Sequence, residues 1–219
     1  MDINFIIEVL PLFQKALFIT LKLACIGIFF SIVIGLICNL LLAKENIFLS
    51  SLVNAYIELS RNTPLLIQLF FLYYGLPKFG IKLDEQVCAI IGLSFLGGSY
   101  MSEALRAGIE AVHKNQIESG LSLGMNKYQL FRYVIMPQAI SVSIPLIAAN
   151  AIFLVKETSV VGIIAVKELM NLSKTLIGVY YKTYETMFLL IIFYLIILLP
   201  LSLILSYIER KIRYAEHGN

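Results

Sequence analysis

The sequence predicts an all-α membrane protein, a bundle of about five transmembrane helices. Of its 219 residues, 59% are hydrophobic and only 14% are charged, whereas a soluble domain is about 45–50% apolar and about 25% charged. Three long stretches, 23–43, 133–155 and 186–208, carry no charge. Each reaches the roughly 20 residues that are needed to cross a hydrocarbon core of about 30 Å.

Two shorter apolar stretches complete the expected bundle, one between Arg61 and Lys78 and one between Glu85 and Glu103. Each needs flanking residues to span, so a buried core helix is the alternative interpretation for both. The five expected spans cover about residues 12–43, 50–75, 86–110, 134–155 and 185–209. They form a single transmembrane domain, residues 1–219, with a loop at about 111–133 between the third and fourth spans.

The distribution of lysine and arginine predicts the orientation. Arg210, Lys211 and Arg213 follow the fifth span, and further basic residues lie in the loop after the third span. Because cytoplasmic loops are enriched in positive charge, both regions are expected in the cytoplasm, and an odd number of spans then places the N-terminus outside. The odd number, without a visible internal repeat, argues against a secondary transporter made of two related halves.

The segment between the fourth and fifth spans, about residues 156–184, is mostly not a continuous apolar run. Its piece from Thr158 to Val166 is apolar but short. We expect a re-entrant or interfacial helix here, which a membrane protein tolerates where the segment is buried against protein.

The loop after the third span has the pattern of a short amphipathic helix. Apolar residues recur at helical spacing, at Ile117, Leu121, Met125 and Tyr128. Gly120 and Gly124 lie one turn apart on a neighbouring face, and glycine costs about 1 kcal/mol in a helix interior relative to alanine. The two glycines indicate that another surface comes very close. We therefore expect a helix over Glu118–Tyr128 that docks into a groove of a cytoplasmic partner; an ordinary interfacial helix is the alternative.

This segment resembles the EAA loop of the permeases of binding-protein-dependent ABC importers, which reads E-A-A, three residues, G, nine residues, I-x-L-P. Glu118-Ser119-Gly120 matches the first part, and Gly124, Val134, Met136 and Pro137 match the rest. The resemblance implies that this helix inserts into a cleft of the ATP-hydrolysing subunit. The residues that it assigns to ATPase coupling are Glu118, Ser119, Gly120, Leu121, Gly124, Met125 and Tyr128.

The second span begins with charged and helix-breaking residues. Thr63 followed by Pro64 predicts a helix start or a kink. Glu58 and Arg61 are three residues apart, so they can pair on one helix face, although charges at the edge of a span can also be simple interface anchors.

The string from Glu58 to Gln68 resembles the E-x-x-R-G-T-P-x-L-x-Q signature of the polar amino-acid branch of the same permeases, with Asn62 in place of glycine. Three later strings resemble further patterns of that branch: Ser99-Tyr100 with Glu103 and Arg106, Lys156-Glu157-Thr158-Ser159, and Glu168-Leu169. The resemblance covers about Lys15 to Arg210. Its structural signature residues are Pro64, Gln68, Glu103, Arg106, Pro137 and Lys156.

The resemblance implies a multi-pass permease subunit in the inner membrane of a bacterial cell, which forms the path for a polar amino acid. The partners that it implies are ABC ATPase subunits, a second permease chain (identical or related) and an extracytoplasmic solute-binding protein. The sequence has no G-x-x-x-x-G-K-[ST] phosphate loop. We therefore expect no catalytic residues and no cofactor in this chain, with ATP and magnesium bound by the partner subunit.

A zwitterionic amino acid needs partners for both of its charges in a low-dielectric path. Glu58 and Glu157 are candidates for the ammonium group, and Arg61, Thr63 or a helix N-terminus for the carboxylate. The alternative is that Glu58–Arg61 and Glu103–Arg106 are structural ion pairs.

Two other functions compete with an ATP-driven importer. A stand-alone ion-coupled secondary transporter or channel needs ionisable residues deep in its spans, and the three long stretches have none at their centres. A non-transporting scaffold is the third possibility. No basic stripe predicts a nucleic-acid partner, and no metal site is expected, because Cys25, Cys38 and Cys88 are unpaired and His113 and His217 are isolated.

Overall fold

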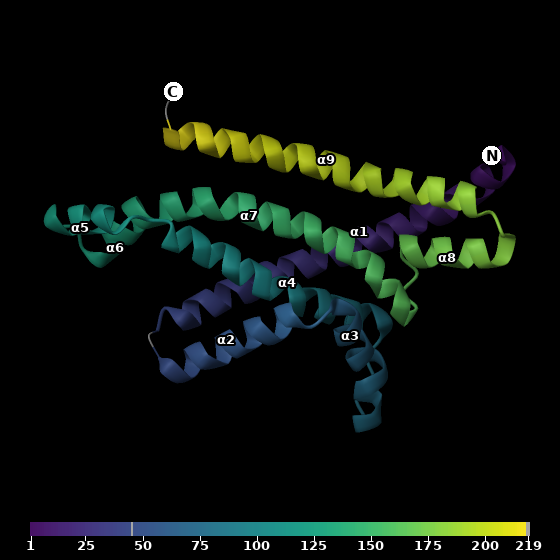
Figure 1. The fold of residues 1–219 in the computed structure, drawn as a ribbon, viewed down its shortest axis with the longest axis horizontal. Helices are drawn as coiled ribbons and strands as arrows, with labels where there is room; N and C mark the ends of the chain where they lie inside the picture. Colours follow the sequence, from purple (N-terminus) through teal and green to yellow (C-terminus); the bar gives the residue numbers. More distant parts are fainter. Residues whose placement is uncertain (45, 218–219) are drawn as a thin grey trace.

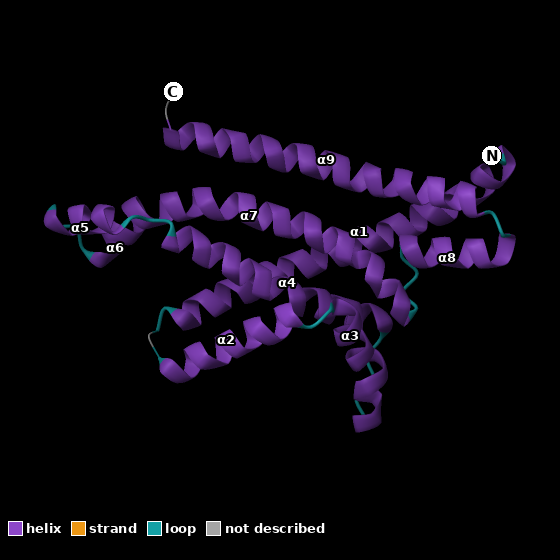
Figure 2. Ribbon diagram, in the orientation of Figure 1, coloured by secondary structure: helices purple, strands orange, loops and turns teal. Residues whose placement is uncertain are grey.

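The described chain consists of helices and connecting loops, as its composition predicts (Figure 2). The computed structural model describes residues 1–44 and 46–217, with side chains up to Lys211, so Arg213 and His217 lie beyond the described side chains. Four segments of the described residues are long and apolar enough to cross a membrane. Three of them contain α1 (Ile3–Leu42), α4 (Glu85–Glu110) and α7 (Met136–Glu157), and the fourth, Thr183–Lys211, is part of α9 (Thr183–His217).

Helix α4 is the central helix, because α1, α7 and the broken second span all pack against it. Small residues let the helices approach closely. At Gly35 of α1, an added Cβ would lie 2.8 Å from the Cβ of Met101 and 2.8 Å from the backbone nitrogen of Ser102. One turn further, the Asn39 amide donates to the carbonyl of Ser102 at 2.9 Å. Small side chains and interhelical hydrogen bonds of this kind hold helices together in a membrane.

The predicted second span is interrupted rather than continuous, and it is not among the four segments long and apolar enough to cross a membrane. Helix α2 (Ile47–Asn62) ends at Thr63–Pro64, which we call the helix break, and α3 (Leu65–Phe70) turns away from it (Figure 1). Proline cannot donate a backbone hydrogen bond, and Gln68 Nε2 donates instead to the carbonyls of Ser60 and Thr63, each at 3.1 Å. The chain then continues through η1 (Phe71–Gly75), a π-helical turn, and η2 (Leu76–Phe79), a 3₁₀ helix.

The segment between the fourth and fifth spans forms a short 3₁₀ helix, η4 (Thr158–Ile164), and a helix that the sequence did not predict, α8 (Leu169–Tyr180). Val161, Gly162 and Ile164 of η4 are buried. This segment thus contains a short helical piece that is buried against protein, and its re-entrant or interfacial position stays a prediction. Helix α8 packs on α9 and α1.

The expected helix over Glu118–Tyr128 is not continuous, so this prediction is wrong in detail. Helix α5 (Lys114–Ser122) ends first, and a separate α6 (Lys127–Leu130) follows. Gly124 lies between them at a φ of +81°, a left-handed conformation that ends helices and favours glycine. From α6 the π-helical η3 (Phe131–Ile135) leads into α7, where Pro137 occupies the first turn, as predicted.

The two ends of the bundle differ. The N-terminus lies at one end, together with α8 (Figure 1). Helices α5 and α6 and the C-terminal end of α9 lie at the opposite end, where the turn between α1 and α2 is also found (Figure 1). The two termini thus lie at opposite ends of the bundle, as an odd number of crossings requires.

Candidate functional site

A hollow of about 350 Å³ opens at the helix break, and we call it the central hollow. It is formed where α2 stops, so backbone and side chains of the break face residues of α4, α7 and η4. Its lining consists of Arg61, Asn62, Thr63, Pro64, Leu65, Leu66, Leu96, Tyr100, Phe153, Glu157 and Val160. Small-molecule sites typically measure about 300–1,000 Å³, so the hollow can hold a small ligand. It brings together three of the four predicted path residues, Arg61, Thr63 and Glu157.

Arg61 supplies the positive charge of the central hollow. Its Nη1 lies 3.1 Å from Glu103 Oε2, and its side chain remains 42% exposed. Its guanidinium carbon lies 5.4 Å from the centre of the Tyr100 ring, within the roughly 6 Å of a cation–π contact. The guanidinium is thus held by α4 on one side and has further N–H donors for an anionic group.

The sequence also suggested that Arg61 pairs with Glu58 on one helix face, and this pairing is wrong. Glu103 of α4 takes Arg61 instead, and its other oxygen accepts from Arg106 Nη2 at 2.7 Å, which confirms the predicted Glu103–Arg106 pair. Glu58 is exposed, lines a neighbouring groove on α2 and has no ion-pair partner among the described side chains. A partner from another helix cannot be read from i, i+3 spacing.

Glu157 supplies the negative charge of the central hollow. It is the last residue of α7, its side chain is partly buried, and no described side chain forms an ion pair with it.

Thr63 has a structural role in the helix break. Its hydroxyl donates to the Leu59 carbonyl at 2.7 Å and accepts from Gln68 at 3.0 Å. Because the single hydroxyl proton is used inside the helix break, Thr63 shapes the hollow and does not offer a donor to a ligand.

The other signature residues are placed around this site. Pro64 forms the helix break, and Gln68 holds it closed through its amide nitrogen. Lys156 is exposed beside Glu157. Sequence reasoning noted Tyr100 only as part of a pattern and missed Phe153. Their rings contact each other, with centroids 5.2 Å apart, and form the apolar wall of the hollow. In the sequence, the aromatic character of Tyr100 beside Ser99 could have indicated this wall, whereas nothing singled out Phe153.

The end that carries α5 presents exposed apolar side chains. Leu121, Leu123 and Tyr128 are 51%, 79% and 73% exposed, respectively. Gly120, in contrast, is buried against its own chain: an added Cβ would lie 2.6 Å from Leu130 Cδ1. The close surface expected at Gly120 is therefore the chain's own following segment, and docking of a partner at Gly124 stays a prediction. Gly120 packs on the segment that follows and Gly124 turns the chain, whereas the leucines face outward, together with Glu118 and Ser119.

Glu168 is a fully buried carboxyl group between η4 and α8, outside the spans. Its two oxygens accept the backbone N–H groups of Met170 and Asn171, each at 2.7 Å, so it caps α8. At Gly162 an added Cβ would lie 2.6 Å from Glu168 Oε1, so any larger residue would displace the carboxyl group. Burial raises the pKa of Glu168 to about 7, although the two backbone donors act in the opposite direction.

Glu168 predicts a pH dependence of stability. Its pKa rises from an ordinary 4.5 to about 7 on folding, so between these values the folded protein binds more protons than the unfolded chain. Stability from this group is complete below pH 4.5 and declines as the pH rises through 7. We expect the thermal midpoint of the detergent-solubilised protein to fall over this range. In Glu168→Gln the fall is expected to be smaller, and Glu118→Gln, at an exposed site, serves as the control with an unchanged slope.

Comparison with known proteins gives a consistent result. A family model described as "Binding-protein-dependent transport system inner membrane component" matches residues 10–214. The chain is 34% identical to the probable amino-acid ABC transporter permease protein PatM of Vibrio harveyi over 221 residues, which cover 98% of this chain and 97% of that protein. It is 35% identical to the probable amino-acid permease protein YxeN of Bacillus subtilis over 212 residues, 95% of each chain.

A solved structure supports the same assignment. One chain in the crystal structure of an amino acid ABC transporter with histidines matches with a TM-score of 0.91 and 32% identity, covering 96% of this chain and 99% of that chain. The match thus covers nearly the whole chain. The chain belongs to the family of binding-protein-dependent transport system inner membrane components.

Proposed function

We propose that this inner-membrane protein is the permease subunit of an ATP-driven importer and forms the path for a polar amino acid. The single observation that carries the proposal is the central hollow, where Arg61 and Glu157 place opposite charges on one cavity at the helix break. A free amino acid carries an ammonium and a carboxylate group, and each needs a partner in a low-dielectric path. The names of PatM and YxeN support the same class of substrate.

In this proposal Glu157 accepts the ammonium group and Arg61 donates to the carboxylate. Glu157 is suited to its role because no described side chain neutralises it. Arg61 keeps its orientation through Glu103 and Tyr100, so its remaining donors are already fixed before the ligand arrives. Tyr100 and Phe153 form the apolar wall of the hollow and limit the size of the substrate side chain.

The energy for transport comes from other subunits in this proposal. A pair of ABC ATPase subunits binds ATP and magnesium and contacts the α5 end, and this chain holds no cofactor and catalyses no reaction. A second permease chain, identical or related, completes the path, and an extracytoplasmic solute-binding protein delivers the amino acid. Membership in a binding-protein-dependent family supports this arrangement over a stand-alone transporter or channel.

Glu157→Gln tests the proposed substrate site. The variant keeps the shape of the side chain and removes the carboxylate of the described lining of the central hollow. We therefore expect uptake to fall at least about tenfold, which corresponds to about 1.4 kcal/mol of lost interaction. Uptake of a labelled amino acid is measured in proteoliposomes that contain the whole transporter with its binding protein. Recovery of the intact complex by gel filtration establishes that the variant assembles.

The matched control is Glu110→Gln, the same change at a 68% exposed glutamate outside the central hollow. It is expected to transport at the wild-type rate. Normal uptake by an assembled Glu157→Gln complex would remove this residue from the path and overturn the proposed site.

A further inference from the structure

Helix α2 has three distinct faces. Val53, Ile57 and Ser60 are buried against the bundle. Leu52 and Leu59 are 59% and 60% exposed and form an apolar face. A third face is exposed and hydrophilic: i, i+3 and i+7 spacing aligns Ser51, Asn54 and Glu58. We call these three residues the polar face of α2.

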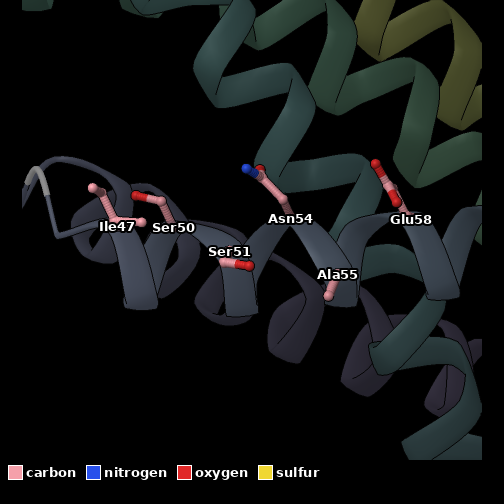
Figure 3. Close-up of a pocket in the computed structure, with 6 residues that line it drawn as sticks. All are labelled: Ile47, Ser50, Ser51, Asn54, Ala55 and Glu58. Carbon is pink, nitrogen blue, oxygen red and sulfur yellow. The ribbon is translucent and has the colours of Figure 1, made fainter.

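The polar face of α2 borders a shallow groove of about 570 Å³ (Figure 3). The groove is lined by Ile47, Ser50, Ser51, Asn54, Ala55 and Glu58. Figure 3 shows the Asn54 and Glu58 side chains projecting from the helix on the same side. Among the described residues, none forms a hydrogen bond or an ion pair with the side chain of Ser51, Asn54 or Glu58. The groove therefore offers hydroxyl, amide and carboxylate groups that have no partner within the chain.

The position of this face within the bundle is informative. Helix α2 begins at the end that carries α5 and finishes at the helix break (Figure 1). Glu58 lies less than one turn from Arg61, which lines the central hollow. The polar face thus extends from beside the hollow toward the α5 end, with the small Ala55 beside it and Ile47 at its start.

A lipid-facing position does not fit this chemistry. Ionisable residues in membrane segments face the interior of the bundle or a water-filled cavity. The two apolar residues Leu52 and Leu59, at i and i+7, give the same helix a separate face for lipid. The hydrophilic stripe is thus a second exposed surface of α2, beside the apolar one.

We propose that the polar face of α2 is the wall of the release route, along which water and the zwitterionic amino acid pass from the central hollow to the α5 end. This inference rests on the proposed function. Glu58 attracts the ammonium group as it leaves Glu157, and Asn54 and Ser51 hydrogen-bond the amino acid without a strong opposite charge. The three residues of the polar face include no cation, so they do not hold the substrate carboxylate strongly. Weak binding suits a release route, because a substrate must be able to leave each site along its path.

Cysteine labelling tests the route in the assembled transporter. Ser51→Cys and Asn54→Cys are made in a background where the exposed Cys25 is replaced by serine, while the buried Cys38 and Cys88 remain. Inside-out vesicles are treated with a positively charged, membrane-impermeant methanethiosulfonate. We expect both thiols to react at least about tenfold faster than Leu52→Cys on the same helix, since only a hydrated thiol ionises to the reactive thiolate. Labelling is also expected to block uptake.

Two outcomes would overturn the route. Equal, slow labelling at Ser51→Cys, Asn54→Cys and Leu52→Cys means that the polar face meets lipid. Fast labelling of both thiols that leaves uptake intact means that the amino acid does not pass along this face. Labelling does not depend on Glu157, so the two proposals separate: slow labelling beside a defective Glu157→Gln removes only the release route, and fast labelling beside a normal Glu157→Gln removes only the proposed substrate site.

Discussion

Replacing Gly97 with leucine is expected to abolish accumulation of the folded protein. Gly97 lies on α4 where α1 and α7 approach it together. An added Cβ would collide with the side chain of Ser31 and lie 2.6 Å from Leu154 Cδ1. Ser31 and Leu154 are both buried, and the Ser31 hydroxyl donates to the Gly27 carbonyl at 2.7 Å, so neither has room to withdraw.

The expected size of this effect follows from packing. Adding methylene groups to a packed core costs about 1–3 kcal/mol in typical cases, and here a whole isobutyl group is forced between three helices. Total stabilities are only about 5–15 kcal/mol, so Gly97→Leu is expected to leave little folded protein, and Gly97→Ala a reduced amount. Fluorescence-detected gel filtration of solubilised membranes measures both yield and shape.

Gly178→Leu is the matched control for this prediction. Gly178 lies on α8, is exposed, and has no atom within 4 Å of an added Cβ. The same substitution there is expected to give wild-type yield and elution. If Gly97→Leu also eluted like the wild type at full yield, α1, α4 and α7 could not be packed as closely at Gly97 as the structure has them.

The spans could be predicted from the sequence because each depends on local composition. A charge-free run of 20 residues has few alternatives to a membrane helix. The interruption at Thr63–Pro64 was also predictable as a break, since proline removes a backbone donor. The repair of that break could not be predicted, because Gln68 reaches back to Ser60 over eight residues once the chain has turned. Only the folded geometry brings its amide to those carbonyls.

The charged groups of the site show the same limit more clearly. Arg61 has an acidic neighbour at three residues' distance, yet it pairs with Glu103 on another helix. Spacing along one helix cannot weigh a partner that arrives from a second helix. Glu168 was noted only as part of a two-residue pattern, and its burial depends on η4 and α8 meeting beside it. In both cases the sequence identified the residue and the tertiary contacts decided its role.

The second large effect is expected at the α5 end. The double variant Leu121→Asp with Leu123→Asp is expected to reduce ATP-driven uptake at least about tenfold, because carboxylates in an apolar contact lose hydration without gaining a partner. Both leucines are at least half exposed, so the fold of the permease depends little on them. The variant is therefore expected in the membrane at wild-type amounts. The tagged permease is purified, the ATPase subunit that co-purifies is quantified, and uptake is measured in proteoliposomes.

Asn115→Asp provides the matched control, since it adds a carboxylate to the same helix with almost no change of shape, at an exposed polar position. It is expected to retain the ATPase and to transport normally, which separates loss of apolar contact from the effect of negative charge. We expect docking to depend on the exposed leucines, because Gly120 packs against Leu130 and Gly124 turns the chain. Full uptake with a retained ATPase in the double variant would show that the α5 end is not where the motor subunit acts.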